Sequence, residues 1–143
     1  MWLLSRWFGK KTPAHLAAGL WGEKQAELFL KDKGFRVLGR RVRVGKKDEM
    51  DLVVKQGEVL VFVEVKTRKS EDFGRPMEAV NRAKREFLSR AAIHFLTRLK
   101  PYQRPTYFRF DVIEVVGEPG APPRTIRHIE NAFTLENGYR VPW

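Results

Sequence analysis

The chain has 143 residues, 43% hydrophobic and 31% charged, which is enough for one domain with a buried core. It has no cysteine, so disulfides, thiolate metal sites and a thiol nucleophile are excluded. Its 28 lysines and arginines outnumber 17 acids and give a net charge of +11, which predicts a polyanionic partner, either nucleic acid or an anionic membrane surface.

The first segment of the chain is short and apolar. Residues 1–14, which include Trp2, Trp7 and Phe8, are expected to form an arm that packs on the domain or on a partner, with an interfacial membrane anchor as the alternative. The cations of this segment follow its apolar stretch instead of preceding it, which disfavours a signal peptide. The longest wholly apolar run, Val59–Val63, is far shorter than the ~20 residues of a spanning helix. We therefore expect no membrane span and a cytoplasmic location.

Hydrophobic periodicity and turn residues predict the remaining elements. In chain order these are a helix from about His15 to Lys33, a strand over Phe35–Leu38 and Arg41–Val44 interrupted near Gly39, strands over Glu49–Val54 and Val59–Lys66, a helix from about Met77 to Leu99, and strands over Tyr107–Val116 and Thr125–Phe133. This order predicts a single α/β domain over residues 15–135, with a central sheet flanked by helices, and a tail over residues 136–143.

Polar residues interrupt two consecutive apolar strands. Because side chains alternate, Glu64 and Lys66 share one face of their strand with Leu60 and Phe62. In the preceding strand, Met50, Leu52 and Val54 are expected on one face and Glu49, Asp51 and Val53 on the other. The polar residues of the two strands can therefore meet on one face of the sheet.

The turn between these strands decides how the acids pair. If Gly57-Glu58 is a two-residue turn, Asp51 lies directly opposite Glu64, and Glu49 lies opposite Lys66. If the turn is Gln56-Gly57, Asp51 becomes a diagonal neighbour of Glu64. Both registers keep the four side chains within roughly 4.5–8 Å of each other.

Each predicted helix also carries charge inside its apolar stripe. The stripe of the first helix, expected to pack on the sheet with Glu23 at its middle, consists of Leu16, Leu20, Glu23, Glu27 and Leu30. Lys84 interrupts the comparable stripe of the second helix. Taken singly, Glu23 is typical of a helix edge, Lys84 of a snorkelling side chain, and Glu64 with Lys66 of a solvated ion pair. Their joint pattern favours a common site.

Converging carboxylates repel one another, and a divalent cation relieves that repulsion. Mg²⁺, or Mn²⁺ in its place, prefers oxygen ligands and keeps several waters, so Glu23, Asp51 and Glu64 suit it. Lys66 beside such an ion would orient or polarise an attacking water, or stabilise the charge that grows on phosphorus. Since the chain is strongly cationic, a phosphodiester is the coherent substrate.

The arrangement of Asp51 followed by Glu64-Val65-Lys66 across a hairpin resembles the PD-(D/E)xK nuclease pattern. A fuller set of residues resembles the small bacterial YraN family, which is similar to archaeal Holliday junction resolvases. These residues are Gly22-Glu23 with Ala26, Asp48–Leu52, Phe62–Arg68, Phe73–Pro76, Lys84 and Arg109–Val112. The resemblance covers roughly residues 15–133. In one departure, Asp48 stands where the family usually has glycine, which adds a negative charge at the start of the strand without removing a ligand.

This resemblance implies a restriction-endonuclease-like core with a central mixed sheet. It also implies Asp51, Glu64 and Glu23 as metal ligands, Lys66 as the catalytic lysine, and a homodimer that cuts two strands symmetrically. The expected phosphate contacts are Arg68, Lys84 and the basic cluster Arg40, Arg41, Arg43, Lys46 and Lys47.

The sequence therefore predicts a metal-dependent DNA endonuclease, with branched or structured DNA as a candidate substrate. The alternative is a non-catalytic nucleic-acid-binding module of the same fold. A third alternative is a scaffold that binds another protein through Trp2, Trp7 and Phe8.

Overall fold

The structure is a computed structural model that describes residues 13–44, 48–70 and 80–143. Most of the predicted N-terminal arm, Lys46, Lys47, the Phe73–Pro76 motif and the predicted start of the second helix at Met77 lie outside the described residues.

The described elements follow the predicted order. They are α2 (Ala14–Asp32), β1 (Arg36–Val44), β2 (Asp48–Gln56), β3 (Val59–Arg68), α3 (Arg82–Thr97), the 3₁₀ helix η2 (Pro101–Gln103), β4 (Tyr107–Val116) and β5 (Thr125–Phe133). The bounds of β4 and β5 are those predicted, whereas η2 is not among the predicted elements. No helix in these ranges is long and apolar enough to cross a membrane.

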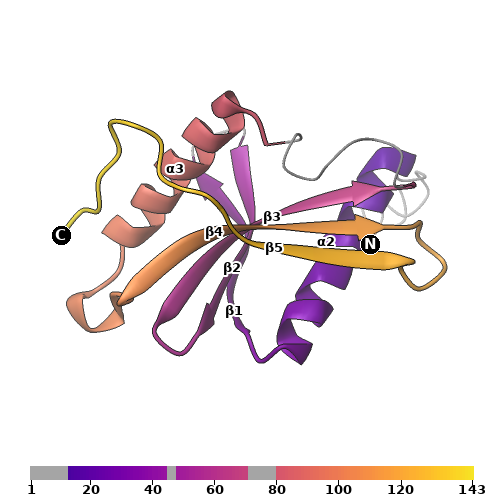
Figure 1. The fold of residues 1–143 in the computed structure, drawn as a ribbon, viewed down its shortest axis with the longest axis horizontal. Coiled ribbons are helices and arrows are strands. Elements are labelled where there is room, and N and C mark those ends of the chain that lie inside the picture. The colour runs from indigo at the N-terminus through magenta and orange to yellow at the C-terminus, as the bar shows by residue number, and fades with distance from the viewer. Residues whose placement is uncertain (1–12, 45–47, 71–79) are drawn as a thin grey trace, which may run out of the picture.

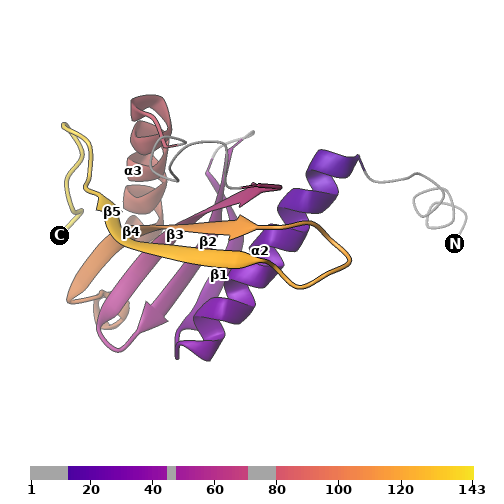
Figure 2. The same cartoon turned by 45° about the vertical axis from the view of Figure 1, so that its right-hand side comes forward.

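The strands form one mixed sheet in the order β1-β2-β3-β4-β5. Neighbouring strands are antiparallel except for β3 and β4, which run parallel and are joined by a crossover through α3. In Figures 1 and 2, α2 and α3 lie on opposite sides of this sheet. The predicted α/β fold, with a central mixed sheet flanked by helices, is confirmed and is consistent with a restriction-endonuclease-like core.

Alternation along the strands builds two separate cores. Leu60, Phe62 and Phe110 pack with α3 on one face of the sheet. Val61 and Val63 pack with α2 on the other face, together with further side chains of β2 and β4. The first residues of β3 are therefore buried on both faces, which explains its continuous apolar run.

The β2–β3 hairpin adopts the first of the two predicted registers. Gly57 and Glu58 form a two-residue turn, and Gly57 has φ +58°, a conformation that glycine adopts without steric cost. Leu52 consequently pairs with Val63.

The expected alternation along β2 is wrong at Asp51. Met50 packs in the α3-side core with Val53, whereas Leu52 packs in the α2-side core. The strand changes face here because β2 pairs with β3 only as far as Leu52, and because Arg41, on the neighbouring strand, has φ +47°. Glu49 is therefore not opposite Lys66, and its Oε1 lies 3.6 Å from Arg43 Nε instead.

The predicted buried stripe of α2 is also partly wrong. Leu16 and Leu20 are 45% and 43% exposed, whereas the buried residues of the helix are Gly22, Ala26, Glu27 and Leu30. The helix is rotated because its closest approach to the sheet runs through Gly22. A Cβ atom placed on Gly22 would lie 1.8 Å from Oγ1 of Thr67 on β3.

We expect Gly22→Ala to destabilise the protein by about 1–3 kcal/mol, since Thr67 has no long side chain that can move aside. A Cβ atom placed on Gly19, on the same helix, would meet no other described part of the chain within 4 Å, so Gly19→Ala should stabilise by up to about 1 kcal/mol. Urea unfolding of the two variants measures the difference. If Gly22→Ala is as stable as Gly19→Ala, α2 does not lie against Thr67 as described.

Candidate functional site

The centre of the candidate site is a contact between two carboxyl groups at the point where β2 and β3 separate. Beyond Leu52 the two strands no longer pair, and Oδ2 of Asp51 accepts the backbone N–H of Val65 at 2.8 Å. The Asp51 side chain thus satisfies a backbone donor that β2 no longer reaches. The Asp51 carboxyl is also hydrogen bonded to Glu64, as the hairpin register predicts.

This contact changes the protonation of Asp51. Burial, the hydrogen bond with Glu64 and the charge of Glu64 together raise the pKa of Asp51 to about 9. The Asp51 carboxyl is therefore protonated in neutral solution and donates to Glu64. Two carboxyl groups in contact form a site that a positive charge would stabilise once Asp51 is ionised.

Glu64 is held from the other side by α3. Its side chain is only 5% exposed, and its Oε2 lies 3.2 Å from Nζ of Lys84. Asn81 caps the helix by accepting the backbone N–H of Lys84 at 2.9 Å, which fixes Lys84 in the first turn. Oε2 receives no well-directed hydrogen bond from the part of the chain that is described, so the Lys84 ammonium is its neighbour without satisfying it fully.

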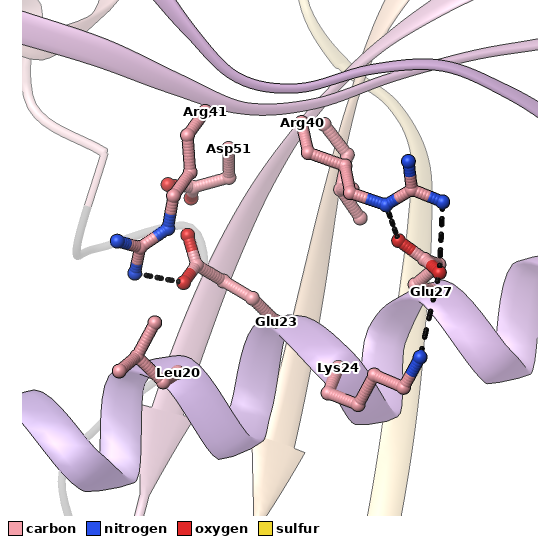
Figure 3. Close-up of a pocket in the computed structure, with 8 residues that line it drawn as sticks. Leu20, Glu23, Lys24, Glu27, Arg40, Arg41 and Asp51 are labelled. Carbon is pink, nitrogen blue, oxygen red and sulfur yellow. Dashed lines mark hydrogen bonds and ion pairs between the residues drawn. The ribbon is translucent and has the colours of Figure 1, made fainter. Parts of the chain in front are cut away.

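Glu23 lies next to this pair but has a partner of its own. Nη2 of Arg41 donates to its Oε2 at 2.6 Å, and Figure 3 shows both side chains beside Asp51. The charge of Glu23 contributes to the raised pKa of Asp51. Glu23, Arg41 and Asp51 line an open pocket of about 220 Å³ between α2 and the strands.

Arg40, which precedes Arg41 on β1, forms an ion pair with a structural role. Arg40 binds the buried Glu27 through Nε and through Nη2, the latter at 3.2 Å (Figure 3). These hydrogen bonds lower the pKa of Glu27 to about 2. A paired Glu27 can therefore occupy the buried face of α2, where hydrophobic periodicity alone would favour an apolar side chain.

The predicted phosphate contacts are mostly engaged within the protein. Arg40 and Arg41 bind acids of α2, Arg43 lies near Glu49, and Lys84 lies near Glu64. The side chain of Arg68 reaches a different acid, Glu114 of β4, with 3.0 Å between Nε and Oε2. The structure thus spreads the predicted contacts over both faces of the sheet.

Lys66 lies two residues beyond Glu64 on the same face of β3, as predicted, and is half-buried. No described side chain or backbone group hydrogen bonds or pairs with its Nζ. Of the two lysines at the site, Lys84 is the partner of Glu64, whereas Lys66 has no ion-pair partner among residues 13–44, 48–70 and 80–143.

A divalent cation at this site would have few protein ligands. Among the described residues, no group of three or more His, Asp or Glu side chains is close enough to hold a metal ion. Mg²⁺ often takes only one or two carboxylates and completes its octahedron with water. Asp51 and Glu64 are the two carboxyl groups in contact that could serve as such ligands.

Sequence reasoning assigned no role to two buried acids of β4, although Asp111 lies within the Arg109–Val112 segment of the family resemblance. Asp111 accepts from Nε of Arg109 at 2.9 Å, from the backbone N–H of Asn131 at 2.9 Å and from His128, with 2.6 Å to Nε2. These hydrogen bonds lower the pKa of Asp111 although burial opposes them. Glu114 is 1% exposed and lies between two arginines. The sequence signal that could have identified both residues is the presence of acids within an otherwise apolar segment of β4, residues Asp111–Val116.

Comparison with known proteins identifies relatives over most of the chain. Residues 22–115 match a family described as "Uncharacterised protein family UPF0102". A UPF0102 protein of Symbiobacterium thermophilum is 47% identical over 113 residues, covering 78% of this chain and 92% of the relative. Another, from Caldicellulosiruptor saccharolyticus, is 42% identical over 112 residues, covering 78% and 92%. A third, from Chloroherpeton thalassium, is 36% identical over 127 residues, covering 89% and 96%.

Proposed function

The chain belongs to the UPF0102 family, which confirms the YraN-like group predicted from the sequence, and from its site we propose that it is a metal-dependent DNA endonuclease. Branched or structured DNA is the candidate substrate. The observation that supports this proposal is the contact of the half-buried Asp51 carboxyl with the buried Glu64 carboxyl, with Lys66 and Lys84 beside them. The net charge of +11 favours a polyanionic substrate.

The proposed roles follow from the contacts. Asp51 and Glu64 would hold Mg²⁺ or Mn²⁺ after Asp51 loses its proton, and Glu23 would reach the ion through water. When bound, the ion would supply Lewis-acid polarisation of the phosphate. Lys66 orients the attacking water or stabilises the charge that grows on the phosphate oxygens. A homodimer would present two such sites for a symmetric double cut.

The alternative is a non-catalytic nucleic-acid-binding module of the same fold. The observation in its favour is the ion pair between Lys84 and Glu64, since a lysine can serve as a permanent counter-ion where the proposed enzyme needs a metal. This alternative predicts DNA binding that divalent ions do not change.

Cleavage of labelled four-way junction, duplex, flap and single-stranded DNA, with and without Mg²⁺ or Mn²⁺, tests the proposal. We expect metal-dependent product from wild type and none from Glu64→Ala, with DNA binding retained. Glu86→Ala, which removes an exposed acid of α3, is the matched control and should cleave normally. Binding without any product in every metal would select the non-catalytic module.

A further inference from the structure

A row of charged side chains crosses three neighbouring strands, beyond the part of β3 that packs against α3. The register aligns Lys66 of β3 with Glu114 of β4, and Glu114 with Arg127 of β5. Since neighbouring strands lie ~4.8 Å apart, the Cα atoms of Lys66 and Arg127 are about 10 Å apart, with Glu114 between them.

The carboxylate in the middle of this row forms ion pairs with two guanidinium groups, of which Arg127 is also hydrogen bonded to it. Oε1 of Glu114 accepts from Nη1 of Arg127 at 2.9 Å, and its Oε2 lies 3.0 Å from Nε of Arg68. The Glu114 side chain is 1% exposed, whereas those of Arg68 and Arg127 are 14% and 43% exposed. A guanidinium has five N–H donors, so it can bind a carboxylate and a phosphate at the same time.

The row is continuous with the candidate active site. Glu64, Lys66 and Arg68 follow one another on the same face of β3, so the row begins two residues beyond the candidate metal ligand. An open hollow of about 360 Å³ at this end of β3 is lined by Lys66, Thr67, Arg68 and Lys69. In Figure 1 the C-terminal ends of β3 and β4 and the start of β5 project together, away from α3.

We propose that Arg68 and Arg127, held by the buried Glu114, form a second phosphate-binding site that receives the nucleic-acid backbone next to the phosphate at Lys66. This inference rests on the proposed function. The second site would give the substrate strand of the endonuclease a path from Glu64 across β3, β4 and β5. Planar guanidinium groups match phosphate geometry, and a buried carboxylate that fixes their orientation reduces the loss of side-chain freedom on binding. Glu114 is thus a positioning residue.

The test measures binding of labelled duplex and four-way junction DNA in chelator, by fluorescence anisotropy at several salt concentrations. Arg127→Ala should weaken binding and reduce the slope of log K against log[salt] by about 0.9. The ratio of variant to wild-type Kd should therefore fall about 3.5-fold between 50 and 200 mM salt. Arg98→Ala removes an exposed arginine at the end of α3 and is the matched control, with an unchanged slope.

Glu114→Gln distinguishes a role of Glu114 in positioning the arginines from the effect of its charge on DNA affinity. The substitution makes the protein more positive, so charge alone predicts tighter DNA binding, whereas loss of orientation predicts weaker binding. Weaker binding by a variant that still unfolds cooperatively supports the proposal. If Glu114→Gln does not fold, Arg127→Ala decides the question by itself.

The outcomes also separate this inference from the function on which it depends. Wild type that binds no nucleic acid overturns both. Wild type that cleaves DNA, with an unchanged salt slope in Arg127→Ala, overturns the second site and leaves the endonuclease intact. In that case the ion pairs of Glu114 only join β5 to β3 and β4, and Arg127→Ala lowers the melting temperature without a change in Kd.

Discussion

Lys66→Ala is expected to lower the rate of DNA cleavage about 10²- to 10⁴-fold, far more than the loss of one phosphate contact weakens DNA binding measured in chelator. The reason is that Lys66 lies on the Glu64 face of β3 and no described residue engages its Nζ, so its ammonium group can serve the reacting phosphate. Single-turnover cleavage at saturating protein measures the chemical step. Lys55→Ala, at the turn end of the same hairpin, removes the same charge and should keep the wild-type rate.

Lys84→Ala distinguishes the two lysines of the site. Loss of Lys84 leaves Glu64 buried without its counter-ion, so we expect a lower melting temperature in chelator. Lys66→Ala should not show this change. If Lys84→Ala abolishes cleavage while Lys66→Ala cleaves normally, the catalytic role assigned to Lys66 belongs to Lys84.

Asp51→Asn should leave the metal-free fold intact or slightly more stable and should abolish its stabilisation by Mn²⁺. An amide mimics the protonated acid, because its oxygen can accept the N–H of Val65 while its NH₂ donates to Glu64. A metal that binds only the folded state stabilises wild type by about 2.7 kcal/mol at a hundred times its Kd. Thermal melts in chelator and then in Mn²⁺ measure both effects.

Asp51→Asn should also change the pH dependence of the protein's stability. The pKa of Asp51 is raised to about 9, so between pH ~4 and 9 the folded protein holds a proton that the unfolded chain has lost. Stability of the metal-free wild type therefore falls as pH rises through this window, by at most about 1.4 kcal/mol per pH unit from this group. Asp51→Asn should flatten that slope. A variant that melts clearly lower in chelator, with no effect of metal on either protein, would contradict the metal site.

Local sequence signals are sufficient to predict the strands and the contact between Asp51 and Glu64. The turn signal at Gly57 limits the β2–β3 hairpin to two registers, and both of them bring Asp51 and Glu64 together, as the structure does in the first register. Alternation also assigns Val61 and Val63 to one face and Phe62 to the other. These features depend on neighbours within a few residues, which periodicity describes well.

The features that the sequence does not predict depend on distant partners. The rotation of α2 follows from its close approach to Thr67 and from the pairing of Glu27 with Arg40, and hydrophobic periodicity includes neither effect. The change of face in β2 depends on a positive φ at Arg41, a residue type with no preference for that conformation. The interactions of Glu114 with Arg127 become visible only when the strand order is known.

The contact between Gly22 and Thr67 has a consequence for the dimensions of the site. Gly22 precedes Glu23 on the helix, and Thr67 follows Lys66 on the strand, so the two acid-bearing elements touch one residue away from their functional groups. The distance between helix and strand is thus set by the backbone of a glycine and the short side chain of a threonine. Neither residue has a long side chain that could change rotamer to widen the gap. If a metal ion binds between Asp51 and Glu64 as proposed, a larger cation could not be accommodated by adjusting one rotamer at this contact, and the whole helix would have to shift. Rigidity at this one contact would make ionic radius a criterion of metal selection.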